Sequence, residues 1–122
     1  MAGSFDIIIE QGSTWSMQML IEDIVAGVAT PRDLTGYTGA MKIKASASST
    51  TELASASFAL SATPIDGKFT LSLSALQTSG IPTTGATFNA YADYVYDVTL
   101  TSGGVTKRIV NGLARVSPGV TK

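Results

Sequence analysis

The sequence contains no cysteine and no histidine among its 122 residues. The absence of cysteine excludes disulfides and thiolate nucleophiles. The absence of both residue types removes imidazole bases and nearly all protein ligands for zinc, copper and haem. We therefore expect a protein that is not an enzyme and that holds no cofactor and no metal. The redox compartment stays open, because a chain without disulfides is tolerated everywhere.

Charge is also scarce, at 14% of the residues against about 25% in a typical soluble domain. Eight basic residues nearly balance nine acidic ones, and the basic residues are scattered along the chain. Because nucleic-acid binding requires a large basic footprint, no nucleic-acid partner is expected. No apolar run approaches the roughly 18 residues of a spanning helix, and no basic segment precedes the first apolar run, so no membrane segment and no signal peptide are expected.

Hydrophobic residues make up 44% of the sequence, which places it among folded proteins. The length suits one ordinary domain, and we expect a single domain over residues 1–122. Apolar and polar residues alternate with a period of two through most of the chain, which is typical of strands with one buried face. The expected strands cover residues 5–10, 14–23, 41–45, 54–60, 68–73, 94–100 and 105–118.

About seven short strands, separated by turn residues and without a long helix, predict an all-β fold: an immunoglobulin-like antiparallel β-sandwich. Residues 74–79 break the alternation and suit one short helical turn, closed by Gly80. The Ser- and Ala-rich segment 54–60 suits an edge strand, and Gly112 suggests a β-bulge in the last strand. A tyrosine near the start of the sixth strand, Tyr94 or Tyr96, suits a tyrosine corner; alternatively, both rings simply pack in the core.

The expected surface is unusually apolar. Ile8, Leu20, Val95 and Ile109 fall on the outward parity of their strands, which suggests contact with another chain or a strand buried on both faces. Two connecting segments, 24–31 and 79–90, are candidate contact loops. Their apolar residues are the expected interface residues: Val25, Val28, Ile81 and Phe88.

The sequence gives weaker support for a cation site, a hydrolase site or a basic binding stripe. Asp93 and Asp97 could bracket a hard cation together with Glu22 or Asp23, or serve a hydrolase that uses only carboxylates, but no calcium-loop motif is present. A basic stripe of Lys42, Lys44, Lys107 and Arg108 is more simply explained as a solvated polar face.

Four segments carry a family resemblance: "FDIIIEQGSTWSMQMLIED", "DLTGYTGAMKIKAS", "GKFTLSLSALQTSGIP" and "YVYDVTLTSGGVTKRIVNGLARVSPGVT". In this order they resemble a small protein of tailed bacteriophages and prophages. The β-sandwich type is similar to the N-terminal domain of phage baseplate upper proteins, and related chains accompany tail fibres and tail tips. The sequence departs from this pattern in the two connecting segments, which are longer than expected.

The resemblance implies a non-enzymatic virion structural protein without a cofactor, made in the bacterial host cytoplasm, that joins or supports a tail, baseplate or tail-fibre assembly. Its partners would be other virion proteins, and it would be a homo-oligomer or present in many copies. One alternative is a capsid decoration, or cement, protein on the major capsid protein. Another is a carbohydrate-binding module for the host surface, whose aromatic candidates are Phe88, Tyr91 and Tyr37.

Overall fold

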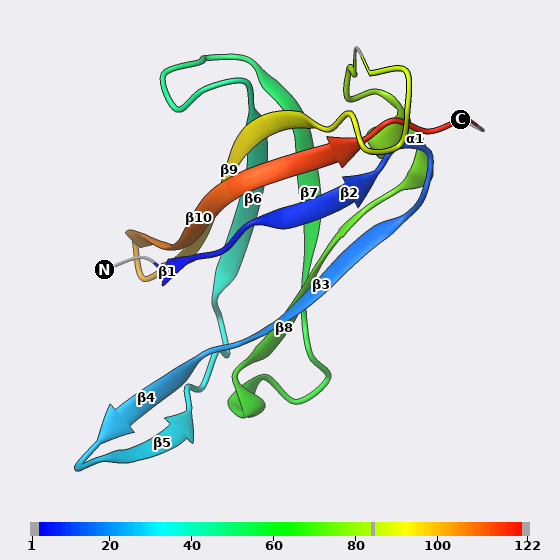
Figure 1. Ribbon diagram of the computed structural model, residues 1–122. Coiled ribbons are helices and arrows are strands. Elements are labelled where there is room, and N and C mark those ends of the chain that lie inside the picture. Colours follow the sequence, from blue (N-terminus) through cyan, green and yellow to red (C-terminus); the bar gives the residue numbers. More distant parts are fainter. Residues whose placement is uncertain (1–2, 84, 121–122) are drawn as a thin grey trace.

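The computed structural model describes residues 3–83 and 85–120, in which strands are the main regular structure (Figure 1). The strands are β1 (Gly3–Ser4), β2 (Ile7–Glu10), β3 (Trp15–Leu20), β4 (Glu22–Val25), β5 (Val28–Pro31), β6 (Thr38–Lys44), β7 (Glu52–Leu60), β8 (Lys68–Leu73), β9 (Ala92–Ser102) and β10 (Val105–Ser117). The helical elements are the 3-10 turn η1 (Pro64–Asp66) and the helix α1 (Ala75–Ser79). Neither helix of the described chain has the length and apolar character needed to cross a membrane.

One long sheet, in the order β1-β10-β9-β6-β7-β8-β3, curls over to form both layers of a sandwich. Strand β7 makes the corner, because its first half pairs with β6 and its second half pairs with β8. The prediction that this segment is an edge strand is therefore wrong: its backbone has a neighbour on each side. A weak alternating pattern does not reveal that a strand belongs to both layers.

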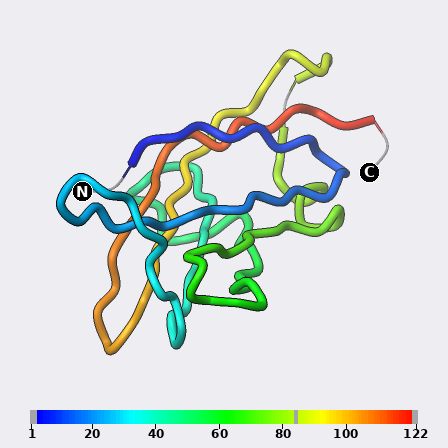
Figure 2. The backbone as a smooth tube through the Cα atoms, turned by 90° about the horizontal axis from the view of Figure 1, so that it is seen from below, coloured from blue at the N-terminus to red at the C-terminus, as the bar shows by residue number. Residues whose placement is uncertain are grey.

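The predicted fold class is confirmed, since the described chain is an immunoglobulin-like all-β sandwich with one helical turn. Two pairings differ from a purely antiparallel arrangement: β1 and β2 both run parallel to β10. Figure 2 shows the N-terminal and C-terminal strands side by side along one edge of the molecule.

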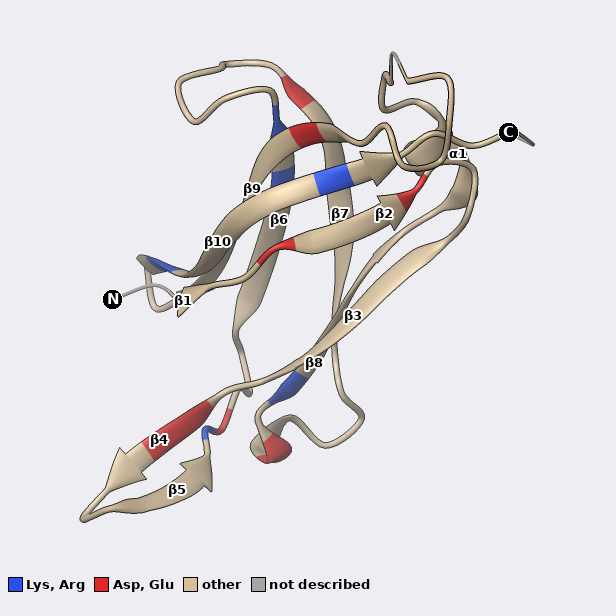
Figure 3. Cartoon of the chain, in the orientation of Figure 1, with Lys and Arg blue, Asp and Glu red and all other residues tan. Residues whose placement is uncertain are grey.

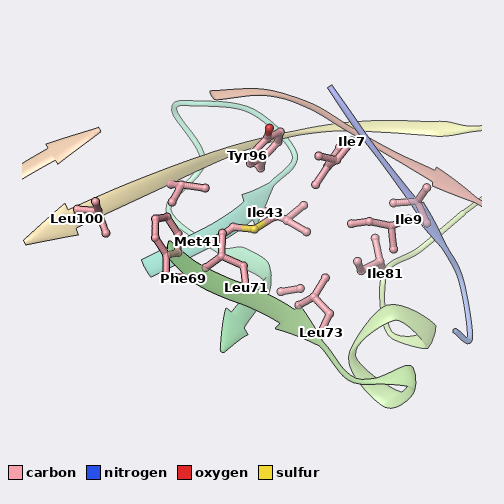
Figure 4. Close-up of a cluster of buried hydrophobic side chains, with 14 of the residues drawn as sticks. Ile7, Ile9, Met41, Ile43, Phe69, Leu71, Leu73, Ile81, Tyr96 and Leu100 are labelled. Atoms are coloured by element: carbon pink, nitrogen blue, oxygen red, sulfur yellow. The ribbon is translucent and has the colours of Figure 1, made fainter. Parts of the chain in front are cut away.

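The core lies between the layers and follows the period-two pattern (Figure 4). Ile7 and Ile9 of β2 and Phe69 and Leu71 of β8 are fully or almost fully buried, and the ring of Phe69 packs against Phe58 with centroids 5.1 Å apart. Burial of large apolar side chains supplies most of the stability of such a fold. The remaining buried hydrophobic residues are Leu34, Met41, Ile43, Ala54, Leu73, Ile81, Tyr96, Val98, Leu100, Ala114 and Val116.

The N-terminal segment runs alongside β10 and approaches it closely at Gly112. A Cβ atom at Gly112 would lie 2.0 Å from the carbonyl oxygen of Phe5, so only glycine allows this close approach. Next to it, the backbone N–H of Leu113 donates to the Asp6 carboxylate at 2.9 Å. The chain passes from β1 to β2 beside Gly112, and Phe5 is exposed although it shares the parity of Ile7.

The bulge predicted at Gly112 is located elsewhere. The register of β10 against β9 shifts between Arg108 and Val110, so Ile109 is the extra residue. This shift turns Ile109 from the expected outward parity to a half-buried position against the core. Gly112 itself pairs regularly with Tyr96, and it serves the close approach of the N-terminal segment instead.

The short helix α1 forms where expected. Ser74 and Gln77 make a capping box, in which each side chain accepts a hydrogen bond from the other residue's backbone N–H. This reciprocal bonding satisfies two N–H groups that a helix of one turn leaves without partners.

Candidate interaction surface

Residues 22–31 form a separate two-stranded sheet, here called the arm, which projects from the body of the sandwich (Figures 1 and 2). In the sequence this segment is expected to be a connection; in the structure it is a β-hairpin of its own. Opposite residues across it are Val25 and Val28 at the tip and Ile24 and Ala29 next. Because strand residues alternate, Val25 and Val28 share one face and Ile24 lies on the other.

The arm leaves its apolar side chains in solvent. The exposed fraction is 64% for Val25, 60% for Val28 and 70% for Ile24. An isolated two-stranded hairpin is marginally stable in water, and here neither apolar face is covered by the body. Val25 and Val28 are residues that the sequence predicts to be at an interface. Ile24 was missed, although its place in the same apolar segment is a signal that the sequence contains.

The tip of the arm is a two-residue turn between the opposed residues Val25 and Val28. Both turn residues have positive φ, 52° for Ala26 and 79° for Gly27, as in a type I′ turn. Glycine adopts this region freely, whereas alanine does so at a cost of roughly 1 kcal/mol. The twist of this turn type matches that of the strands, which keeps the tip compact.

The base of the arm is held by both charge and backbone contacts. Arg32 makes two hydrogen bonds to one carboxylate oxygen of Asp23, at 2.6 and 3.0 Å. These bonds lower the pKa of the Asp23 carboxyl and raise the pKa of the Arg32 guanidinium, so both groups stay ionised at neutral pH. The Ile21 N–H donates to the Gly67 carbonyl at 2.8 Å, and the Arg32 N–H donates to the Ile21 carbonyl at 2.9 Å. The arm thus leaves the body in a defined direction.

The second predicted contact segment, 79–90, divides into a buried start and an exposed end; its residue Thr84 lies outside the described residues. Ile81 is fully buried, so the prediction that it contacts a partner is wrong. Its carbonyl accepts a hydrogen bond from the Gln11 side chain at 2.8 Å, and its side chain lies in the core near Ile9 (Figure 4). The helical turn before it directs Ile81 inward, and no local sequence pattern predicts this burial.

Phe88 lies on the exposed part of this segment, and 61% of the residue is accessible to solvent. Its carbonyl accepts a hydrogen bond from the Ser117 hydroxyl at 2.8 Å, which anchors the segment to the end of β10. Phe88 also borders a shallow cavity of about 270 Å³ beside the C-terminal segment, with Pro118 and Val120. The arm and the Phe88 segment are therefore two separate exposed apolar sites.

The two candidate corner tyrosines make different bonds. The Tyr94 hydroxyl donates to the carbonyl of Pro82 at 2.5 Å, which is the bond of a tyrosine corner. The Tyr96 hydroxyl donates to the carbonyl of Phe5 at 2.5 Å and so ties the N-terminal segment to β9. Burial, together with the nearby Asp6 carboxylate, raises the pKa of Tyr96 to about 12.

The carboxylates do not gather around a cation. Asp93 pairs with Arg115 at 3.0 Å, whereas Glu22 and Asp23 belong to the arm. Among residues 3–83 and 85–120, no three Asp or Glu side chains are placed to hold a metal ion together.

The aromatic candidates for sugar binding do not share a platform. Tyr37 is half-buried against the core just before β6, at the end of the sheet where Thr38 pairs with Thr101. Tyr91 and Phe88 precede β9 at the opposite end, and Arg115 lies over the Tyr91 ring, 4.7 Å from its centroid. Because these rings lie at two ends of the molecule, they cannot stack on one sugar.

Comparison with known proteins assigns the chain to no family. No family model matches the chain, and no curated protein matches it. Among solved structures, the chain is similar to the NK cell receptor Nkp44, a triggering partner in natural cytotoxicity, with a TM-score of 0.38 and 12% identity over 96% of this chain and 99% of that one. These values support no statement about what this chain binds.

Proposed function

We propose that this chain is a non-enzymatic structural protein of a bacteriophage virion, which joins or supports a tail, baseplate or tail-fibre assembly. The resemblance of its sequence segments to small tailed-phage proteins supports the assignment to a phage particle. The structural observation that supports the proposal best is the arm, a projecting hairpin that is apolar on both faces.

The arm has the properties of a contact element. Full burial of a Val or Ile side chain stabilises by roughly 1.5–3 kcal/mol relative to exposure, so three such side chains offer a large gain to a partner. The Arg32–Asp23 pair and the Gly67 contacts fix the base of the arm before binding. A preformed element loses less conformational entropy on association than a flexible loop does.

The Phe88 segment provides a second, smaller contact. Aromatic side chains are enriched where proteins meet, because one ring buries a large area at a small cost in conformational entropy. Since the arm and Phe88 belong to different parts of the chain, one subunit offers contacts to two neighbours, as a component that joins an assembly requires.

The proposal is tested by cross-linking mass spectrometry on purified particles of the phage that encodes this chain. Cross-links to tail, baseplate or fibre proteins are expected. Links confined to the major capsid protein would replace the tail assignment with capsid decoration, and absence of the chain from particles would overturn a virion role.

A variant test assigns the contact to the arm. Val25→Asp with Val28→Asp is expected to reduce incorporation into particles at least about tenfold, because two charges would be buried at the contact. Leu76→Asp with Val105→Asp is the matched control, since both side chains are exposed and lie outside the arm and the Phe88 segment. Equal incorporation of the two double variants would contradict a contact role for the arm.

A further inference from the structure

A groove of about 680 Å³ crosses the outer face of the sheet, on the side away from the core. Its centre is β9, where Val95 and Asp97 alternate with the buried residues Tyr96 and Val98. On either side of Val95 lie Lys44 of β6 and Leu113 of β10, and on either side of Asp97 lie Lys42 and Asn111. The volume lies within the range of sites that hold specific ligands.

The groove combines a positive rim with an apolar strip. Three cations line it, Lys42, Lys44 and Arg108, against the carboxylates Asp6 and Asp97. Lys42 is paired with Glu52 at 3.8 Å. Within the described chain, Lys44 and Arg108 have no carboxylate within ion-pair distance, so their charges are available to a ligand.

The apolar strip is formed by Val95 and Leu113, which are paired across β9 and β10. An apolar strip bordered by unpaired cations suits a partner with apolar side chains and nearby carboxylates. A small inorganic anion would leave the apolar strip uncovered.

The arm has this complementary composition. Its tip is apolar, and around its base lie the carboxylates of Glu22, Asp23 and Asp33 against the single guanidinium of Arg32, as Figure 3 shows for the arm and its exit. Arg32 neutralises Asp23, which leaves an excess of negative charge. Hydrogen bonds from Thr35 lower the pKa of Asp33, so this carboxyl is ionised at neutral pH.

We propose that the groove of one copy binds the arm of a second copy of this chain, which rests on the proposed role of the arm as a contact element. On the face of the arm that carries Glu22, Ile24 and Ala29 cover Val95 and Leu113, while Glu22 and Asp33 approach Lys44 and Arg108. Charge complementarity and the matching apolar parts favour this occupant over an acidic polymer, because such a polymer has no apolar side chains to cover the strip.

The contact is heterologous, because the arm and the groove are different parts of the surface. Each copy would therefore keep one free arm or one free groove, and association would continue into a ring or a chain of subunits. The arm and the groove are therefore sufficient to link many copies of the chain, and no third contact surface is needed.

The test is sedimentation velocity on the full-length chain over a concentration series. Wild type is expected to associate increasingly with concentration. The groove variant Lys44→Glu with Arg108→Glu and the arm variant Ile24→Ser with Ala29→Ser are each expected to raise the dissociation constant at least about tenfold. Controls are Lys68→Glu with Lys107→Glu, and Leu76→Ser with Val105→Ser, which are exposed residues outside both surfaces and leave association unchanged.

Mixing the two variants identifies the heterologous arrangement. The arm variant retains a groove and the groove variant retains an arm, so an equimolar mixture is expected to form heterodimers and nothing larger. A wild type that stays monomeric to millimolar concentration, or a groove variant that associates as wild type does, would overturn the inference. If association fails while Val25→Asp with Val28→Asp still reduces particle incorporation, this inference falls and the proposed function stands.

Discussion

The body of the sandwich and the arm use similar residue types in opposite ways. In the body, apolar side chains from β2, β6, β8 and β9 lie in one shared core. In the arm, Ile24, Val25 and Val28 alternate across a regular hairpin and face solvent on both sides. The difference teaches that regular β-structure does not by itself indicate burial: the body is stabilised by its own packing, whereas the apolar residues of the arm still have burial energy to gain from a partner.

The largest expected effect tests this contrast directly. Phe69→Ala removes a fully buried ring from the core and is expected to destabilise the fold by about 3–5 kcal/mol. Phe88→Ala removes the same side chain from an exposed position and should change the free energy of unfolding by less than about 0.5 kcal/mol. Urea denaturation of both variants measures the difference; comparable losses would mean that the exposed segment belongs to the folding core.

The close approach of the N-terminal segment to β10 is the next most sensitive part of the body. Gly112→Ala places a methyl group against the Phe5 carbonyl, and we expect a loss of about 1–3 kcal/mol as the strands move apart. Gly3→Ala is the control, since its added Cβ would meet the Ile109 carbonyl oxygen at an ordinary 3.7 Å. Equal effects of the two substitutions on thermal unfolding would argue against steric exclusion at Gly112.

Tyr96→Phe removes the bond to the Phe5 carbonyl and should cost about 0.5–1.5 kcal/mol at neutral pH. It should also change the alkaline stability. The pKa of Tyr96 is about 12 in the fold, above the value of about 10 for an unfolded tyrosine. A raised pKa means that folding favours the protonated hydroxyl, so its contribution is complete below about pH 10 and is lost as pH rises through about 12.

Denaturation midpoints of wild type and Tyr96→Phe, measured at neutral pH and between about pH 10 and 12, check this prediction. The two proteins should approach each other in stability across the alkaline range. Tyr94→Phe is the matched control, because it loses the Pro82 bond instead. A constant difference between wild type and Tyr96→Phe at every pH would contradict the assignment.

The smallest expected effect lies in the arm. Ala26→Asn replaces a residue strained at positive φ by one that tolerates this region, and the hairpin should gain up to about 1 kcal/mol. Because the arm contributes little to the core, we expect the gain as slower amide exchange within residues 22–31, with almost no change in the global midpoint. A change in global stability as large as the local one would show that arm and body unfold together.

Much of the body could be predicted from alternation alone. The strands around Met17, Leu71 and Val98, the helical turn at Ser74 and a tyrosine bond at Tyr94 all depend on local residue order or on a near neighbour. Local patterns failed where a second chain segment decides the environment. Ile81 is buried by its place beside β2, and Gly112 is required by Phe5, which lies far away in sequence.

The contact surface was predictable only in part. Val25, Val28 and Phe88 stand out as apolar residues in segments rich in turn residues, and they are exposed. The groove could not be assembled from the sequence, because Lys44, Val95 and Leu113 come together only through the pairing of β6, β9 and β10. A basic stripe was visible, but the apolar strip beside it was not.

The sequence by itself determined the main strands and the short helix of the body, because the period of two and the turn residues act over a few neighbouring positions. It also determined the chemistry available, since a chain without cysteine and histidine has no thiol or imidazole to offer. Only the tertiary structure decided that β7 joins both layers, that Ile81 is buried and that the arm extends from the body uncovered. Those outcomes depend on which distant segments pack together, and packing is a property of the whole chain rather than of any local pattern.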